Sequence, residues 1–169
     1  VCLDGALEGW QALDDWLALA HEPVAHRGAA ADDAFQMYTS GTTGRPKGAV
    51  LSQQALFTAI YQWCLLYPLA PGDRQLLMLP MYHIAGLQNA FHAAACGASV
   101  YLQSELDAPE LVRVLDEERI ARAPLVPTII GDLLRVPGVE QRRYATLRFM
   151  TYGGAPIDAA LLARALEVF

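Results

Sequence analysis

The chain has 169 residues, of which 54% are hydrophobic, and a formal net charge of −6 at pH 7. This length corresponds to one ordinary domain, and the acidic balance without any run of lysine or arginine argues against a nucleic-acid partner. No apolar stretch approaches the ~18 uninterrupted residues of a transmembrane segment, and no secretory leader begins the chain, so we expect a cytoplasmic location.

The two ends of the sequence indicate a piece of a longer protein. Val1 is not a methionine, and Phe169 falls inside a predicted helix that no glycine or proline closes. The hydrophobic fraction also exceeds the ~45–50% usual for soluble domains. We therefore expect residues 1–169 to form a single α/β piece that packs against the rest of its own chain.

The three cysteines, Cys2, Cys64 and Cys96, are widely spaced and odd in number. They match no zinc-binding pattern and no disulfide framework of a secreted protein. Cys64 and Cys96 stand among apolar neighbours, which is typical of buried small hydrophobic residues.

Short apolar runs alternate with helical patterns along the chain, which predicts an α/β fold. We expect a three-layer open sheet, mostly parallel, with helices on both faces. Strands are predicted over 34–39, 49–51, 75–79, 99–102, 122–126 and 147–151. Helices are predicted over 10–17, 53–67, 87–95, 108–115, 127–134 and 161–169, with N-caps at Ser52 and Asp107 and a left-handed glycine cap at Gly97.

Three irregular stretches each follow a predicted strand: TSGTTGRPKG (39–48), PMYHIAG (80–86) and YGGAP (152–156). The carboxyl ends of parallel strands share one edge of a sheet, and ligands of open α/β sheets bind at that edge. We therefore expect the three stretches to meet at one crevice.

The first stretch surrounds one lysine, Lys47, with glycines and small hydroxyl side chains. Glycines allow backbone N–H groups to form an anion-binding nest, while hydroxyls donate hydrogen bonds and Lys47 adds positive charge. The Walker A pattern does not match, because Lys47 follows Pro46 and a strand is predicted next. The residues favour a site for a phosphate chain, and the alternative is a polar surface hairpin.

The stretch YTSGTTGRPKGAVLS (38–52) resembles the phosphate-binding signature of the AMP-forming adenylating enzymes. This family includes acyl-CoA synthetases, luciferases and the adenylation domains of peptide synthetases. LPMYHIAGL (79–87), VPTIIGDLL (126–134) and YGGAPI (152–157) are similar to further family segments in the same order. The aromatic–histidine form of the second segment favours an acyl-CoA synthetase, and the resemblance extends over residues 32–169.

The resemblance implies an enzyme that uses ATP and Mg²⁺ to activate a small carboxylate as acyl-AMP, releases pyrophosphate, and forms a thioester with CoA. It implies that His83 gates the passage between the acyl pocket and the thiol tunnel, and that Thr128 and Gly153 also bind the substrate. The nucleotide-binding residues that it implies are Thr39, Ser40, Gly41, Thr42, Thr43, Gly44, Lys47, Gly154, Ala155 and Pro156.

Several alternatives stay open at this point. The family's metal ligands and catalytic lysine lie beyond this sequence, so the metal site is unknown and the isolated piece is expected to be inactive. The acyl chain and the choice between CoA and a carrier-protein thiol are not readable. Two hypotheses place the chain outside the enzymes. In one it is a non-catalytic nucleotide- or acyl-binding module, and in the other it is half of a structural scaffold.

Overall fold

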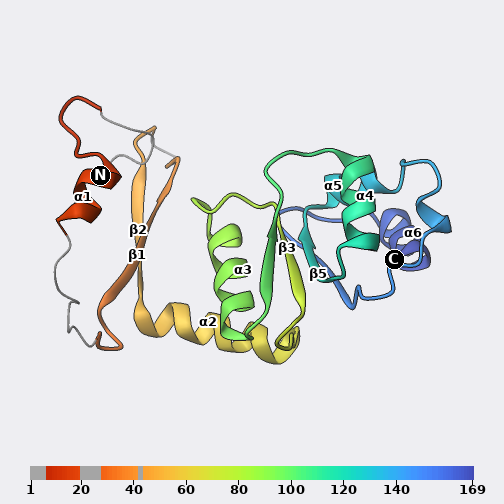
Figure 1. Ribbon diagram of the computed structural model, residues 1–169, viewed down its shortest axis with the longest axis horizontal. Helices are drawn as coiled ribbons and strands as arrows, with labels where there is room; N and C mark the ends of the chain where they lie inside the picture. The colour runs from red at the N-terminus through yellow and green to blue at the C-terminus, as the bar shows by residue number, and fades with distance from the viewer. Residues whose placement is uncertain (1–6, 20–27, 42–43) are drawn as a thin grey trace.

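The computed structural model describes residues 7–19, 28–41 and 44–169. Its main body is a parallel sheet of four strands in the order β4-β3-β5-β6 (Figure 1). The strands are β3 (Arg74–Leu77), β4 (Ser99–Leu102), β5 (Ile120–Leu125) and β6 (Phe149–Tyr152). The predicted α/β class with a mostly parallel sheet is confirmed.

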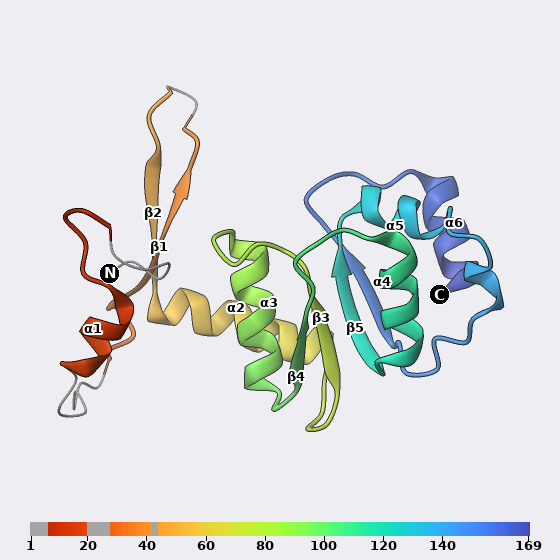
Figure 2. The same cartoon turned by 45° about the horizontal axis from the view of Figure 1, so that its top comes forward.

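Helices cover both faces of this sheet, so the body has the three layers that the sequence predicts (Figures 1 and 2). One face carries α2 (Gln53–Leu66) and α3 (Ile84–Ala95), and the other carries α4 (Ala108–Glu117), α5 (Pro127–Leu133) and α6 (Ala159–Val168). The remaining helices are α1 (Leu13–Ala18), near the amino terminus, and the 3-10 turn η1 (Val139–Gln141).

The main hydrophobic core lies between the sheet and the layer of α4, α5 and α6. The buried face of α4 supplies Leu111, Val112 and Leu115, at the spacing that places them on one side of a helix. Asp107 caps this helix by accepting a hydrogen bond from Glu110 N, as predicted. Strand residues that meet the helices in this core include Leu76, Ala123 and Leu125.

The stretch TSGTTGRPKG (39–48), called the phosphate-loop stretch below, does not follow a strand of the parallel sheet. The expectation that it follows such a strand was wrong. The stretch joins β1 (Asp33–Thr39) to β2 (Lys47–Ser52), which form a separate antiparallel pair in which Thr39 lies opposite Lys47. A short connection can only return the chain beside itself in the antiparallel sense, because parallel strands need a crossover of a dozen or more residues.

Several predicted boundaries shift, including those of α3 and β3, and three predicted caps are confirmed. Helix α3 begins at Ile84 rather than 87, because the His83 side chain accepts a hydrogen bond from Ala85 N and caps the first turn. Strand β3 ends at Leu77, two residues before the predicted end. Ser52 and Asp107 cap their helices, and Gly97 is left-handed with φ of 68°.

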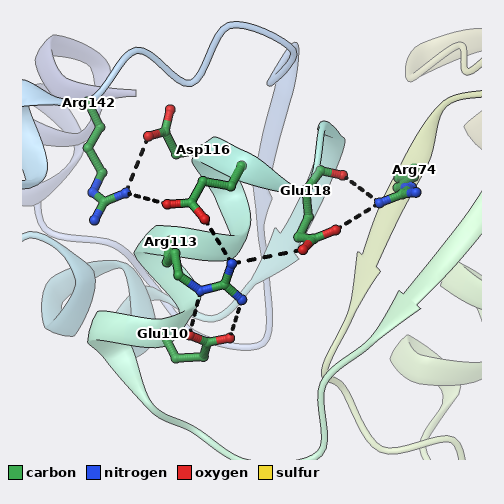
Figure 3. Close-up of polar contacts among 7 residues, drawn as sticks. Arg74, Glu110, Arg113, Asp116, Glu118 and Arg142 are labelled. Carbon is green, nitrogen blue, oxygen red and sulfur yellow. Dashed lines mark hydrogen bonds and ion pairs between the residues drawn. The ribbon is translucent and has the colours of Figure 1, made fainter.

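A chain of ion pairs crosses the surface of α4 and ties it to its neighbours (Figure 3). Arg113 contacts Glu110 at 2.6 Å and Glu117 at 2.9 Å, while Glu118 pairs with Arg74 at 2.9 Å at the start of β3. These side chains are partly exposed, so solvent screens the pairs and each adds little stability. We assign the network to structure and not to binding.

The outward face of α2 carries large apolar side chains that no described residue covers. Phe57 is 70% exposed, Tyr61 56% and Leu65 65%.

Among the described residues, no helix combines the length and apolarity needed to cross a membrane.

Replacing Leu115 with alanine is expected to lower the free energy of unfolding by about 2–5 kcal/mol, because the side chain is 0% exposed in the core and its removal leaves a cavity. Leu115→Met, which keeps most of the volume, should cost less than ~1.5 kcal/mol. Urea unfolding followed by circular dichroism measures both, and equal losses for the two variants would contradict the packing described here.

Candidate active site

The phosphate-loop stretch is an exposed hairpin tip. Ser40, Gly44 and Lys47 are exposed, and Gly44 N donates to Gly41 O at 3.3 Å across the turn. Thr39 Oγ1 donates to Lys47 O at 3.5 Å, at the base of the turn. Thr42 and Thr43 lie outside the described residues. The loop thus presents hydroxyl, amide and ammonium groups to its surroundings.

Gly41 is the residue whose lack of a side chain this turn requires. Its φ of +66° falls in the left-handed region, and a Cβ atom there would clash with the backbone carbonyl of Arg45. Gly44 also has a positive φ, of +80°, but a Cβ there would meet open space. The curled backbone therefore depends on Gly41 for space and on both glycines for conformation.

The other two stretches do meet at the carboxyl edge of the parallel sheet. PMYHIAG follows β3 and YGGAP follows β6, and residues of both line one cavity of about 470 Å³. His83, Gly153 and Gly154 belong to this lining, together with Val126 at the end of β5. Gly153 N donates to Leu125 O at 3.3 Å, which holds the glycine pair against the strand. Of the three stretches expected to share one crevice, these two do so, whereas no described residue of TSGTTGRPKG lines this cavity.

Besides the residues of the hairpin, three predicted site residues do not line that cavity. Ala155 and Pro156 continue the YGGAP stretch in exposed positions and are absent from the cavity wall. Thr128 is exposed in the first turn of α5 and also does not line it. Their roles remain predictions from the resemblance.

His83 stands between the hairpin and the main cavity. It lines the 470 Å³ cavity and also a smaller one of about 250 Å³, whose wall includes Thr39 and Tyr38 at the end of β1. Its Nδ1 accepts a hydrogen bond from Ala85 N at 3.2 Å, so in the neutral ring Nε2 carries the hydrogen. The ring is therefore fixed as a donor at the junction of the two cavities.

A buried polar cluster that the sequence did not predict forms one wall of the cavity. Arg122 of β5 is 0% exposed, and its Nη1 donates to Gln75 Oε1 at 2.8 Å and to Asn89 Oδ1. Its Nη2 donates to Thr151 Oγ1 at 3.2 Å. The available signal was a charged residue inside an apolar strand, IARAPL, but it does not reveal the partners.

Aromatic rings enclose the same guanidinium. The Arg122 Cζ atom lies 4.9 Å from the ring centroid of Trp63 and 4.9 Å from that of Tyr67. Cation–π attraction offsets part of the cost of burial. Burial lowers the pKa of Arg122 to about 10, which leaves the side chain charged at pH 7.

His92, which belongs to none of the sequence motifs, is buried in this cluster. Its Nδ1 lies 2.9 Å from Gln75 Oε1 and its Nε2 lies 3.1 Å from Tyr67 O. Burial and the positive charge of Arg122 lower the pKa of His92 from 6.5 to about 4, so the ring is neutral at pH 7. This histidine supports the cavity wall and does not face the hairpin.

Cys64 and Cys96 are half-buried, not fully buried as expected, and their sulfur atoms lie 3.5 Å apart. Together with His92 they place three possible ligand atoms within 4.8 Å of one another. Burial and the neighbouring Cys96 thiol raise the pKa of Cys64 to about 11, and both nitrogens of His92 already have partners. Because metals bind thiolates and free imidazole nitrogens, we assign no metal here.

A family model for AMP-binding enzymes matches residues 3–169. The chain belongs to the AMP-binding enzyme family. The predicted recognition is confirmed, because the match covers nearly all of the sequence and includes the three stretches described above.

Curated relatives of this AMP-binding chain are ligases. It is 34% identical over 145 residues to the long-chain-fatty-acid–CoA ligase FadD13 of Mycobacterium tuberculosis, which covers 86% of this chain and 29% of the relative. It is 36% identical over 126 residues to the indoleacetate–CoA ligase of Aromatoleum aromaticum, covering 74% and 25%. The fatty acid–[acyl-carrier-protein] ligase ScoC of Streptomyces coeruleorubidus is 34% identical over 173 residues, covering 99% and 32%. The chain thus spans about a third or less of their length.

Solved structures show the same fold. The inhibitor-bound N-terminal domain of FACL13 from Mycobacterium tuberculosis superposes with a TM-score of 0.81 at 31% identity, covering 93% of this chain and 40% of that domain. ATP-bound MatB from Rhodopseudomonas palustris gives 0.80 at 29% identity, covering 94% and 31%. The expected place of this piece, within the N-terminal domain of an adenylating enzyme, agrees with these similarities.

The buried state of His92 predicts a specific loss of stability in acid. Its pKa is about 4 when folded and near 6.5 when unfolded, so the unfolded chain binds more protons between these values. The stability that the neutral ring supplies is complete above pH 6.5 and is lost as the pH falls towards 4. Between pH 7.5 and 4.5, the free energy of unfolding of His92→Gln should fall by about 2–3 kcal/mol less than that of the unmodified chain. Urea unfolding at the two pH values measures both. Parallel pH profiles would contradict this assignment.

Proposed function

We propose that this chain is part of an ATP-dependent acid–thiol ligase that converts a carboxylate to acyl-AMP and then to an acyl-CoA thioester. On this proposal, residues 1–169 form one piece of the AMP-binding domain of a cytoplasmic enzyme, packed against the rest of its chain. The apolar face of α2 described above supports that packing.

One observation carries the proposal. The 470 Å³ cavity lies at the carboxyl edge of the parallel sheet, and His83 connects it to the smaller cavity at the base of the phosphate-loop hairpin. A ligand with its acyl part in the larger cavity and its phosphates at the hairpin would pass directly beside His83. This arrangement joins a carboxylate to a phosphate donor, as adenylation requires.

The hairpin supplies what a departing pyrophosphate needs. Attack of a carboxylate on the α-phosphorus brings two anions together, so positive and hydrogen-bonding groups must offset their repulsion. Lys47 would supply a point charge and Ser40 a hydroxyl donor. Thr39 would donate to the phosphates by giving up its hydrogen bond to Lys47 O. The predicted residues Thr42, Thr43 and Gly44 would complete this cradle.

At the cavity, Gly153 and Gly154 would let the substrate lie flat against the backbone, with Ala155 and Pro156 beside the adenine and Thr128 near the acyl group. His83 would donate from Nε2 to a carboxylate oxygen and so orient the carboxylate towards the hairpin. CoA, or a carrier-protein thiol, would then take the acyl group as the thiol nucleophile.

Mg²⁺ belongs to the proposed reaction, but the described residues supply no site that fits it. Their single group of three possible metal ligands is Cys64, His92 and Cys96. Mg²⁺ prefers oxygen ligands, so these thiols and imidazole do not fit. We derive no step for the metal from this chain.

A second candidate is an adenylating enzyme that loads a carrier-protein thiol instead of CoA. The similarity to ScoC, whose name specifies an acyl-carrier-protein as the acceptor, supports this second candidate. Parallel assays of the full-length parent with CoA and with a carrier protein separate the two acceptors. A non-catalytic binding module would give no pyrophosphate with either one.

Lys47→Ala in the full-length parent is expected to lower kcat/KM for pyrophosphate release on the order of 100-fold, because one charge that offsets the phosphates is lost. Arg45→Ala is the matched control, since it removes a cation from the same hairpin outside the predicted site, and it should change the value less than about threefold. Equal effects of the two substitutions would show that the position of Lys47 has no special role.

The isolated 169-residue chain is expected to release no pyrophosphate from ATP with any carboxylate, because the family's catalytic lysine and metal ligands are not within it. The measurement compares the isolated chain with the full-length parent at equal concentration. Clear turnover by the isolated chain would overturn this expectation.

A further inference from the structure

Arg122 is a buried cation without an anionic partner among the described residues. The residue is 0% exposed, and the described side chains within hydrogen-bonding distance of it are the neutral groups of Gln75, Asn89, His92 and Thr151. No ion pair joins it to a carboxylate in the part of the chain that the structure describes. Buried charges in proteins are normally paired, so this one is exceptional.

The hydrogen-bonding capacity of the guanidinium is also incomplete. Arg122 Nε is buried and has no hydrogen-bond partner in residues 7–19, 28–41 and 44–169. An arginine side chain has five donor hydrogens, and a buried donor without an acceptor is unfavourable. The rings of Trp63 and Tyr67 contact the faces of the guanidinium but accept no proton from Nε.

This cation lies in the wall of the proposed substrate cavity. Arg122, Thr151, Trp63 and Tyr67 line the same 470 Å³ cavity as His83. Its size falls within the range of about 300–1,000 Å³ typical of small-molecule sites. A ligand held by His83 at one end can therefore reach the region of Arg122 without leaving the cavity.

Thr151 offers a route from the cavity to the charge. Its hydroxyl oxygen accepts from Arg122 Nη2, so its own hydrogen remains available to an acceptor in the cavity. The adjacent positive charge polarises this hydroxyl and strengthens such a bond. The wall is thus prepared for an oxygen anion.

We propose that Arg122 and Thr151 form a subsite for a second carboxylate, so that the preferred substrate of this site is a dicarboxylic acid. One carboxylate lies beside His83 for adenylation, and the other accepts from Thr151 and neutralises Arg122. This inference rests on the proposed function for the identity of the reaction, but the binding of the second carboxylate does not require turnover.

The test compares matched acids of four to ten carbons, each as the mono- and the α,ω-dicarboxylic acid, with the full-length parent. At the best length, kcat/KM for pyrophosphate release should be roughly 30-fold or more higher for the dicarboxylic acid, mainly through a lower KM. Arg122→Met should abolish this preference, and Arg122→Lys should retain part of it. A preference for the monocarboxylic acid at every length would overturn the proposal.

Calorimetric titration separates this inference from the proposed function. Tighter binding of a dicarboxylic acid by the unmodified parent than by Thr151→Val would support the subsite even if no acid were adenylated. If the unmodified parent binds the mono- and the dicarboxylic acid equally tightly, or binds neither, the proposed subsite is overturned. If Arg122→Met does not fold, the preference of the unmodified enzyme and the Thr151→Val titration still decide the question.

Discussion

The buried guanidinium of Arg122 joins more elements of this structure than any other described side chain. From β5 it donates to Gln75 of β3, Asn89 of α3 and Thr151 of β6, and the rings of Trp63 and Tyr67 enclose it from α2. Because each of these partners is neutral, they hold the Arg122 side chain in place but do not neutralise its positive charge. The face of the sheet towards α2 and α3 is therefore polar at its centre, whereas the opposite face is an ordinary apolar core.

The elements governed by local chemistry could be predicted from the sequence. Ser52 and Asp107 accept from backbone amides three residues later, and Gly97 takes the left-handed conformation, so these helix ends follow from neighbouring residues alone. The pairing of β1 with β2 could not be predicted in the same way. The runs DAFQMYT and KGAVLS do not by themselves fix their partner strands, and the available signal was the short connection between them, which is too short for a parallel crossover.

The candidate site also has one part that could be predicted from the sequence and one part that could not. His83, Gly153 and Gly154 belong to continuous motifs, and their meeting at one cavity follows from two parallel strands that end at the same edge. The cluster around Arg122 is assembled from residues separated by 29 to 47 positions. A lone arginine in an apolar strand signals that something must satisfy it, but only the packing of the sheet identifies what does.

The antiparallel pair β1 and β2 forms a sheet of just two strands, so in the described part of the chain each strand has one free edge. Unpaired amides and carbonyls along such an edge are a template for another strand, and an isolated hairpin is only marginally stable in water. The orientation of the turn that holds Lys47 therefore depends on whatever docks alongside these edges. The distance between the hairpin tip and the 470 Å³ cavity is therefore set by those neighbours and not by the loop itself.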